Sequence, residues 1–320
     1  MNSRLSAVET QTGQLFGDLW HKYDDTSFKH SVELWEKRWL ANGESPEYFI
    51  GKKCLDVGCG GGRYTIAMAL MGAKSSTGVD VGEEGLQDGR KRVEQLGLRG
   101  VQFCRGSAFH LDFPENHFDF VCCSGVLHHT PSVEQGLREL CRVTKPGGGV
   151  YLLLYGAGGL YWPLNLVMRS FARILGKDEV DRCSAVAGLP ANKRRTVLDD
   201  LFVPILETYS PERVEHLLTS AGFKEWRRWT SGKLDHESSP SEIVNEVRLR
   251  ERIWQEGANT SANQQYAQVE LKLSQLCRDV AEAGETLLSQ QQAGLLAENE
   301  LHESIIGTGH HRLIAQKAAA

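Results

Sequence analysis

The chain of 320 residues lacks several features that would assign it to a special class of protein. It has no excess of positive charge, since its formal net charge is −5, so we expect neither nucleic acid nor an anionic membrane as its partner. No uncharged stretch is long enough to span a bilayer, and the first residues, "MNSRLSAVETQTGQ", lack the apolar core of a signal peptide. With 41% hydrophobic and 24% charged residues, the composition is typical of a soluble globular protein.

Cysteine pairing is a further feature that the sequence lacks. The chain has eight cysteines, but no two of them form a CxxC pair. Several lie within apolar runs: Cys54, Cys104, Cys122 and Cys123. Thiols in such positions are typical of buried residues in a reducing compartment, so the sequence predicts a cytoplasmic protein.

What the chain does have is a regular alternation of strands and helices between residues 52 and 155. The pattern predicts strands at 52–58, 75–81, 101–106, 117–125 and 149–155, with helices at 63–72, 83–97 and 132–144. The strands are nearly continuous apolar runs, as expected where helices cover both faces of a sheet. The fold class is therefore α/β, a doubly wound sheet of mostly parallel strands.

The stretch "CLDVGCGGGRYT", residues 54–65, is a strand followed by a glycine-rich loop. In open α/β sheets, ligands bind beyond the carboxyl ends of the strands, which is where this loop falls. Gly58, Gly60 and Gly62 allow a tight turn and a close approach of the ligand to the backbone. A dinucleotide fingerprint would need a further glycine at the position of Arg63.

Two aspartates refine the choice of ligand. Asp56 stands two residues before the first glycine, where a carboxylate suits a ligand with an ammonium group better than one with a pyrophosphate. S-adenosylmethionine (SAM) carries an ammonium group and no phosphate. Asp80 ends the second strand, where its carboxylate can accept both ribose hydroxyls, an arrangement that serves NAD and SAM equally. The residues thus favour SAM, and a nicotinamide oxidoreductase is the less favoured alternative.

Four ordered motifs, "LDVGCGGG", "GVDV", "DFPENHFDFVCCSGVLHHT" and "LRELCRVTKPGG", resemble the class I SAM-dependent methyltransferases, in particular the ubiquinone-biosynthesis-like branch. The resemblance covers roughly residues 50–155 and implies a Rossmann-like core that binds SAM. It implies cofactor contacts from Asp56, Gly58, Cys59 and Gly60 at the methionyl end, Asp80 and Val81 at the ribose, and Ser107 and Ala108 at the adenine. Family members commonly carry an aspartate in place of Ser107, so we expect backbone groups or a neighbouring side chain to replace its hydrogen bond.

The segment "SGVLHHT" follows the fourth predicted strand, so Ser124 and the loop to His129 should face the sulfonium. His129 is the candidate catalytic base, because imidazole titrates near neutrality. The alternative is that the His128–His129 pair shapes the cofactor loop by packing and hydrogen bonds. No metal is expected, because adjacent histidines do not converge easily on one ion.

The rest of the chain surrounds this core. We expect a helical N-terminal lid at 1–45, the SAM-binding core at 46–155, a helical cap at 156–205, completion of the core at 206–235 and a helical extension at 236–320. Phe16, Trp20 and Tyr23 recur at helical spacing, which fits the lid or a packing stripe. Tyr23, Tyr155, Tyr161 and Trp162 are the candidate acceptor contacts, and the alternative for the cap is packing alone.

The C-terminal third carries an apolar stripe in steps of three and four residues. Its members are Val269, Leu273, Leu276, Val280, Ala283 and Leu287. The stripe fits a helix hairpin packed on the domain or a homodimer contact. The last segment, "IIGTGHHRLIAQK", is expected to be frayed.

Three functions are compatible with these patterns. SAM-dependent methyl transfer to a small-molecule acceptor is the preferred one. The alternatives are intramolecular cyclisation or lysis of SAM, which a closed pocket with no room for an acceptor would favour, and SAM binding without catalysis. Sequence patterns do not distinguish among acceptors, because a shared fold does not fix the substrate.

Overall fold

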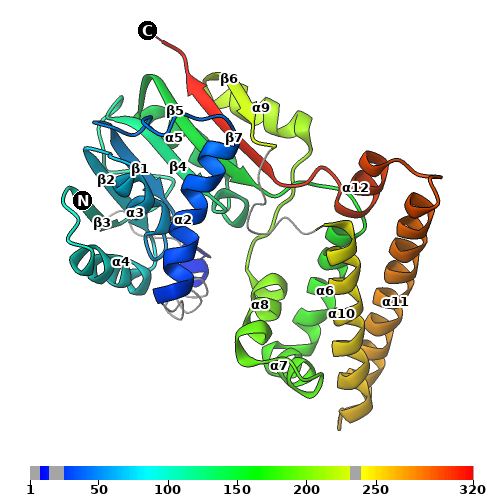
Figure 1. Cartoon of the computed structure of the whole chain (residues 1–320). Coiled ribbons are helices and arrows are strands. Elements are labelled where there is room, and N and C mark those ends of the chain that lie inside the picture. The colour runs from blue at the N-terminus through cyan, green and yellow to red at the C-terminus, as the bar shows by residue number, and fades with distance from the viewer. Residues whose placement is uncertain (1–7, 14–24, 231–238, 320) are drawn as a thin grey trace. The chain divides into compact units, whose positions relative to one another are not determined.

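The structure, a computed structural model, describes residues 8–13, 25–230 and 239–319 (Figure 1). It divides into two compact units, and the chain passes from one unit to the other several times. The sheet unit comprises residues 1–155, 204–235 and 310–320, and the helical unit comprises residues 156–203 and 236–309. The predicted lid residues Phe16, Trp20 and Tyr23 lie outside the described residues.

The sheet unit is built on seven strands in the order β3-β2-β1-β4-β5-β7-β6. Their bounds are β1 Lys53–Val57, β2 Ser75–Asp80, β3 Val101–Arg105, β4 Phe118–Ser124, β5 Thr144–Leu154, β6 Phe223–Arg228 and β7 His311–Lys317. The first five strands are parallel to one another, and β7 is antiparallel to both β5 and β6. The predicted doubly wound α/β fold is confirmed. The strand order reverses between β1 and β4, the place where such sheets bind ligands.

Helices cover both faces of this sheet. Successive strand residues point to opposite sides, and both sets are apolar, so each face needs a cover. In β5, Val150 and Leu152 join one apolar cluster while Tyr151 and Leu153 join the other. Helices α5 (Val133–Val143) and α9 (Pro211–Ala221) pack on the first face, and α2 (Asp25–Ala41) and α3 (Arg63–Leu70) on the second. Helix α4 (Glu83–Gln95) packs near β2 and β3, and a short 3₁₀ helix, η1 (Leu127–His129), follows β4.

The C-terminal segment is not frayed, and this prediction was wrong. Residues 311–317 form β7, which runs between β5 and β6 (Figure 1). Leu313 and Ala315 are buried there and pair with Leu152 and Val150 of β5. The sequence does not reveal this strand, because its apolar run, residues 313–315, is short and follows three helices. The extension at 236–320 is therefore helical only before its final strand.

The helical unit joins two segments that are far apart in sequence. It contains α6 (Tyr161–Leu175), α7 (Lys177–Val186), α8 (Ala191–Phe202), α10 (Pro240–Thr260), α11 (Gln264–Gln292) and α12 (Glu298–Ile306). Met168 from α6, Cys183 from α7, Trp254 from α10 and Cys277 from α11 lie in one buried cluster. The segment expected to be a separate cap thus shares its core with the C-terminal helices.

The apolar stripe of α11 is used within the chain. Leu273 is buried, and Val269, Leu276 and Val280 pack partly buried against the same cluster, which matches the hairpin interpretation. Helices α10 and α11 form the hairpin, and the capping box of Ser239 and Glu242 begins α10 as predicted. The buried face of α11 also contains the polar residues Glu270 and Ser274, which a search for apolar spacing does not find.

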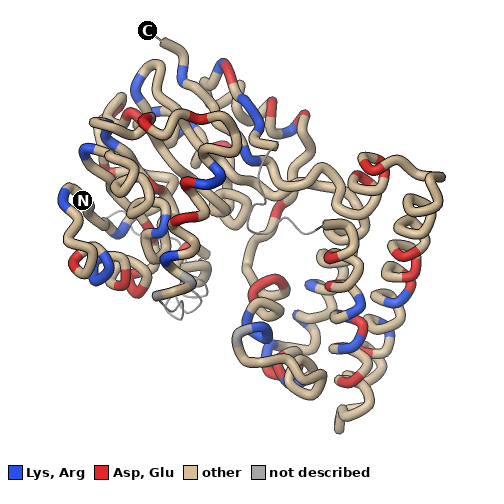
Figure 2. The backbone as a smooth tube through the Cα atoms, viewed as in Figure 1, with Lys and Arg blue, Asp and Glu red and all other residues tan. Residues whose placement is uncertain are grey.

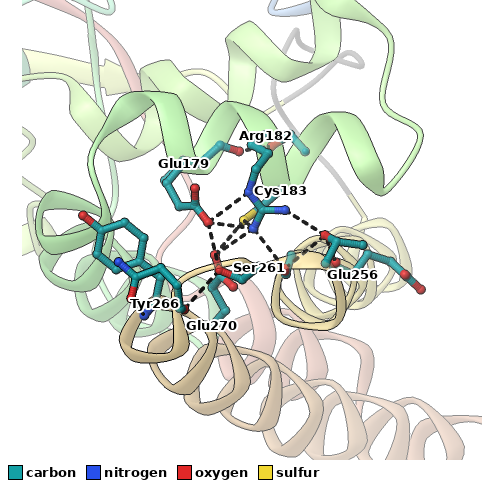
Figure 3. Close-up of polar contacts among 12 residues, drawn as sticks. Glu179, Arg182, Cys183, Glu256, Ser261, Tyr266 and Glu270 are labelled. Carbon is teal, nitrogen blue, oxygen red and sulfur yellow. Dashed lines mark hydrogen bonds and ion pairs between the residues drawn. The ribbon is translucent and has the colours of Figure 1, made fainter.

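Glu270 belongs to a polar network that connects three helices of the helical unit (Figure 3). The Arg182 guanidinium donates to Glu179 at 2.6 Å, to the Gly257 carbonyl at 2.9 Å and to Glu270 at 3.3 Å. The Cys183 thiol donates to Glu270 at 3.0 Å. Burial raises the pKa of Glu270, whereas the hydrogen bond from Arg182 lowers the pKa of Glu179. The positive charge of Arg182 balances the two glutamates, so we interpret the network as a structural link between α7, α10 and α11.

Charges of both signs are interspersed along the helices of each unit (Figure 2). This distribution agrees with the formal net charge of −5 and offers no extended basic face in the view shown. Across the described ranges, no helix combines the length and the apolar character that crossing a membrane requires.

Candidate functional site

A cavity opens in the sheet unit beyond the carboxyl ends of β1, β2 and β4. Its walls include residues 57–61, 80–82 and 124–126, together with His129 from η1. It encloses about 1280 Å³ of empty space, counting the part open to solvent. The carboxyl ends of the strands beside the switch point are where doubly wound sheets bind ligands, so this cavity is the candidate site.

The glycine loop after β1 forms one wall of the cavity. Gly58 has φ 71° and Gly60 has φ 51°, the left-handed region that glycine adopts without strain. The backbone N–H groups of Gly58 and Cys59 donate to the Val79 carbonyl at 2.7 and 3.1 Å. A Cβ atom on Gly58 would lie 2.2 Å from a methyl carbon of Val126. Any side chain there would force the loop out of its place.

Asp80 holds the same loop from the end of β2. Its carboxylate accepts from the Gly60 N–H at 2.8 Å and from the Gly82 N–H at 2.8 Å. Burial raises the pKa of Asp80, while these backbone hydrogen bonds lower it. Asp80 and Val81 both line the cavity, so the carboxylate is fixed where a ligand can reach its remaining lone pairs.

Asp56 lies beneath the loop and is not among the residues that line the cavity. One carboxylate oxygen accepts from the N–H and the hydroxyl of Thr65, at 2.9 and 2.7 Å. The other oxygen is buried and has no hydrogen-bond partner among the described residues. Burial raises the pKa of Asp56 to about 6, although the bonds from Thr65 and the charge of Arg63 lower it.

Of the residues predicted to contact the adenine and the sulfonium, two line the cavity and one does not. Ala108 and Ser124 line the cavity, and the Ser124 hydroxyl donates to the Tyr64 hydroxyl at 3.3 Å. Ser107 lies behind the wall, where its hydroxyl donates to Glu9 and accepts from the Phe109 N–H. Glu9 itself lines the cavity, so a carboxylate adjoins Ser107 on the cavity side.

His129 lines the cavity and is 6% exposed. Its Nδ1 lies 2.9 Å from the Ile205 carbonyl oxygen. A carbonyl only accepts, so Nδ1 carries the proton and, in the neutral ring, Nε2 carries the lone pair. His128 is fully buried, neither of its ring nitrogens has a hydrogen-bond partner in the described part of the chain, and burial holds its pKa well below the usual value.

The candidate acceptor contacts come from different parts of the chain. Tyr155 stacks on His128, with ring centroids 3.8 Å apart, and is not among the lining residues. Tyr161 and Trp162 lie at the start of α6 in the helical unit, where the charged groups nearest Tyr161 include Asp200 and Arg250. Tyr23 lies outside the described residues.

The structure adds wall residues that the sequence did not single out. Phe28 and Ser31 of α2, one helical turn apart, line the cavity with Arg63 and Arg92. The Arg92 guanidinium lies 4.0 Å from the centre of the Phe28 ring and donates to the Gly61 carbonyl at 3.3 Å. The spacing of Phe28 and Ser31 is a helical signal available in the sequence, whereas Arg92 lies on a polar helix with no such signal.

Comparisons with known proteins agree with this geometry. Residues 55–152 match the family model described as a methyltransferase domain. The chain is 38% identical over 137 residues to a demethylmenaquinone methyltransferase of Geobacillus stearothermophilus, covering 40% of this chain and 58% of that one. It is 31% identical over 205 residues to a ubiquinone biosynthesis O-methyltransferase of Azoarcus sp. (strain BH72), covering 59% of this chain and 85% of that one.

The chain belongs to the class I SAM-dependent methyltransferases. Its similarity to named relatives lies with the ubiquinone-biosynthesis-like branch, as the motifs indicated, and SAM is the cofactor of this methyltransferase. The chain spans little more than half the length of the Geobacillus relative. The solved structure of the [4+2]-cyclase SpnF shares the fold, with a TM-score of 0.51 at 17% identity and coverage of 99% of this chain and 98% of that one. That likeness concerns the fold alone.

The cavity of this methyltransferase fits the cofactor in two respects. The glycine loop places bare backbone on the cavity wall, where a ligand can approach it closely, and Asp56 offers a buried oxygen that a nearby ammonium group could partner. Asp80 adds a fixed carboxylate at the end of the neighbouring strand. These groups match the adenosine and the amino acid portion of SAM better than a pyrophosphate.

Proposed function

We propose that this methyltransferase transfers a methyl group from SAM to a hydroxyl of an apolar aromatic small molecule, with His129 as general base. The observation that carries the proposal is that one cavity is lined by the glycine loop, by Asp80 and by His129. Cofactor contacts and a candidate base therefore share one enclosed space. Bound SAM supplies an electrophilic methyl group on its sulfonium.

The residues that hold the cofactor follow the sequence predictions in part. We assign the methionyl end to Gly58, Cys59 and Gly60, with Asp56 acting from beneath the loop. Asp80 and Val81 hold the ribose, Ala108 and Ser107 flank the adenine, and Ser124 lies near the sulfonium. These assignments are supported by the cavity walls and by the unpartnered oxygen of Asp56.

His129 suits the removal of a proton from the acceptor. Its Nδ1–H is bound to the Ile205 carbonyl, so the neutral ring presents a basic Nε2. A hydroxyl must lose its proton when it attacks a methyl group, and general-base help is typically worth roughly 10²–10⁴-fold. Alignment of the two reactants and exclusion of water supply the rest of the acceleration.

The acceptor class follows from the apolar walls and from the names of the relatives. Val8, Phe28, Val126 and Phe109 lie among the lining residues, which suits an aromatic ring better than a sugar or an amino acid. The names of both relatives refer to quinones. Both relatives are named as methyltransferases, which favours methyl transfer over intramolecular cyclisation or lysis of SAM.

We further propose that the helical unit supplies acceptor contacts, including Tyr161 and Trp162, and that the protein acts in the cytoplasm. All eight cysteines are free and seven of them are buried, which suits a reducing compartment. A homodimer would need a surface other than the buried stripe of α11, for example the exposed Leu271.

The experiment uses methyl-labelled SAM with catechols that bear alkyl chains of increasing length. The wild-type protein should transfer label to the ring hydroxyl, whereas His129→Ala should lower kcat by at least about 10²-fold with SAM affinity little changed. An exposed histidine on α9, His216, provides the matched control, and His216→Ala should behave as wild type. SAM binding without transfer to any catechol would contradict the acceptor class, and unchanged kcat in His129→Ala would contradict the base.

A further inference from the structure

The connections between the two units converge on the histidine pair. Described residues flank three of the passages: Tyr155 ends the first part of the sheet unit, Pro204 begins the second part and His310 begins the third. Beside each passage, a residue contacts one of the histidines or Tyr155: Tyr155 stacks on His128, His310 stacks on Tyr155, and the Ile205 carbonyl binds His129. The chain thus leaves and re-enters the sheet unit at the candidate base.

The second connection fixes the backbone and the ring of the pair. The Ile205 carbonyl accepts from Nδ1 of His129 at 2.9 Å, and the Glu207 N–H donates to the His128 carbonyl at 3.0 Å. Both contacts come within four residues of the point where the chain returns from α8. The tautomer of His129 therefore depends on a segment that directly follows the helical unit.

The first and third connections form a stack of rings. The His128 and Tyr155 centroids lie 3.8 Å apart at 28°, and the Tyr155 and His310 centroids lie 4.7 Å apart at 18°. The His129 ring meets the His128 ring edge-on at 4.2 Å and the Tyr155 ring at 5.5 Å. Since the buried His128 ring has no hydrogen-bond partner for either nitrogen among the described residues, ring packing is what holds the ring.

Hydrogen bonds tie the three connections to one another. The Tyr209 N–H donates to the Tyr155 carbonyl at 2.9 Å, and Nε2 of His311 lies 2.6 Å from the Tyr209 carbonyl. His311 is 1% exposed and also receives a hydrogen bond from Arg228. A shift of one connection would therefore be passed to the others and to the rings that surround His129.

We propose that Tyr155 and His310 are positioning residues of the methyl-transfer reaction, which set the orientation and tautomer of His129 through the ring stack. This inference rests on the proposed role of His129 as the base. Removal of either ring frees the His129 ring to turn away from the Ile205 carbonyl.

The first test reads the tautomer of His129 directly. Two-dimensional ¹H–¹⁵N NMR of histidine-labelled full-length protein at pH 8, where free imidazole is neutral, distinguishes Nδ1–H from Nε2–H. Wild type, His216→Ala and Tyr155→Phe should show the Nδ1–H form of His129. Tyr155→Leu and His310→Ala should show a mixture with the Nε2–H form. An unchanged Nδ1–H form in both of these variants overturns the proposal.

The second test is a double-mutant cycle measured with the alkylcatechol acceptor. Tyr155→Leu should lower kcat by about 10-fold in the wild-type background, with SAM affinity within about twofold, and should have no further effect in His129→Ala. Tyr155→Phe should restore kcat because it keeps the ring. An equal loss in both backgrounds overturns the positioning role. Unchanged kcat in His129→Ala contradicts the proposed base, even where NMR shows that the stack sets the tautomer.

Several groups near His129 could change its tautomer or its protonation in these measurements. Those in ring contact with His129 or stacked next to it are His128, Tyr155 and His310, and the charged residues that share the cavity are Glu9, Arg63, Asp80 and Arg92. None of these charged residues is altered in the variants above. A change in the His129 tautomer therefore reports on the ring stack.

Discussion

Asp56 and Asp80 are buried carboxylates at the ends of neighbouring strands, and each has its pKa raised by burial. The negative charge of Asp80 also raises the pKa of Asp56. Such a pair disfavours its own ionisation until a cation arrives, which suits a site for a ligand that carries a sulfonium and an ammonium group. A bound cation would therefore stabilise the ionised form of both carboxylates.

The first prediction concerns the pH dependence of stability through Asp56. Its pKa of about 6 lies above the value near 3.9 expected in the unfolded chain, so its stabilising contribution is complete below about pH 4 and is lost as the pH rises through about 6. Asp56→Asn removes this loss. Urea denaturation should therefore show a gain of Asp56→Asn over wild type that is larger at pH 7.5 than at pH 4.5, by about 2 kcal/mol.

The same variant should bind SAM more weakly, because its amide does not attract an ammonium group. A gain that is equal at both pH values would contradict the raised pKa of Asp56. SAM affinity equal to that of wild type would contradict its role beneath the loop.

Much of the site at this scale could be predicted from the sequence. Gly58, Gly60, Asp80 and His129 line the cavity as expected, because a glycine loop and strand ends have fixed places in a doubly wound sheet. The place of Ser107 behind Glu9 could not be predicted, because that contact joins residues 98 positions apart. The neighbours of Tyr155 could not be predicted either, because His310 arrives from the far end of the chain.

Elements far apart in the chain complete the sheet. The strands β1 to β4 were predicted closely from their apolar residues and the glycines around them, whereas β5 begins at Thr144, five residues before its predicted start. Strand β7 was missed because "HRLIAQK" has only three consecutive apolar residues between polar and charged ones, and because it stands beyond three helices. Its two neighbours in the sheet, β5 and β6, are what make it a strand.

The second prediction tests β7 by truncation. A chain that ends at residue 309 leaves the facing N–H and C=O groups of β5 and β6 without partners and uncovers the apolar faces around Leu313 and Ala315. It should lose cooperative thermal unfolding and SAM binding. The matched control ends at residue 317, just after β7, and should melt as the full chain does. Cooperative melting of the shorter chain at the same temperature would contradict the place of β7 in the sheet.

At the scale of the whole molecule, two insertions build one helical unit. One follows β5 and the other separates β6 from β7, and their helices share a core that includes Met168 and Trp254. The sequence suggested two separate additions, because nothing in a local pattern shows which distant helices pack together. The sheet unit keeps all seven strands and the entire lining of the cavity.

The third prediction is that the two insertions can be removed only together. Replacing residues 157–202 and 239–308 with short glycine–serine linkers should leave SAM affinity within about threefold and lower methyl transfer by more than about 10²-fold. Removing 157–202 alone should cause aggregation, because it exposes the apolar surfaces of α10 and α11. Calorimetry and size-exclusion chromatography measure both effects. Normal turnover of the double deletion would show that the helical unit has no part in acceptor binding.

The central claim is that the cavity binds SAM with Asp80 on the ribose, and titration calorimetry tests it most directly. S-adenosylhomocysteine and its 2′,3′-dideoxy analogue are titrated into wild type, Asp80→Ala and the exposed control Asp112→Ala. Wild type and Asp112→Ala should prefer the ribose form by about 1.5–3 kcal/mol, the scale of a hydrogen bond to a charged group. Asp80→Ala should bind both forms equally while its circular dichroism matches that of wild type. Absence of binding by wild type, or an undiminished preference in Asp80→Ala, would contradict the account.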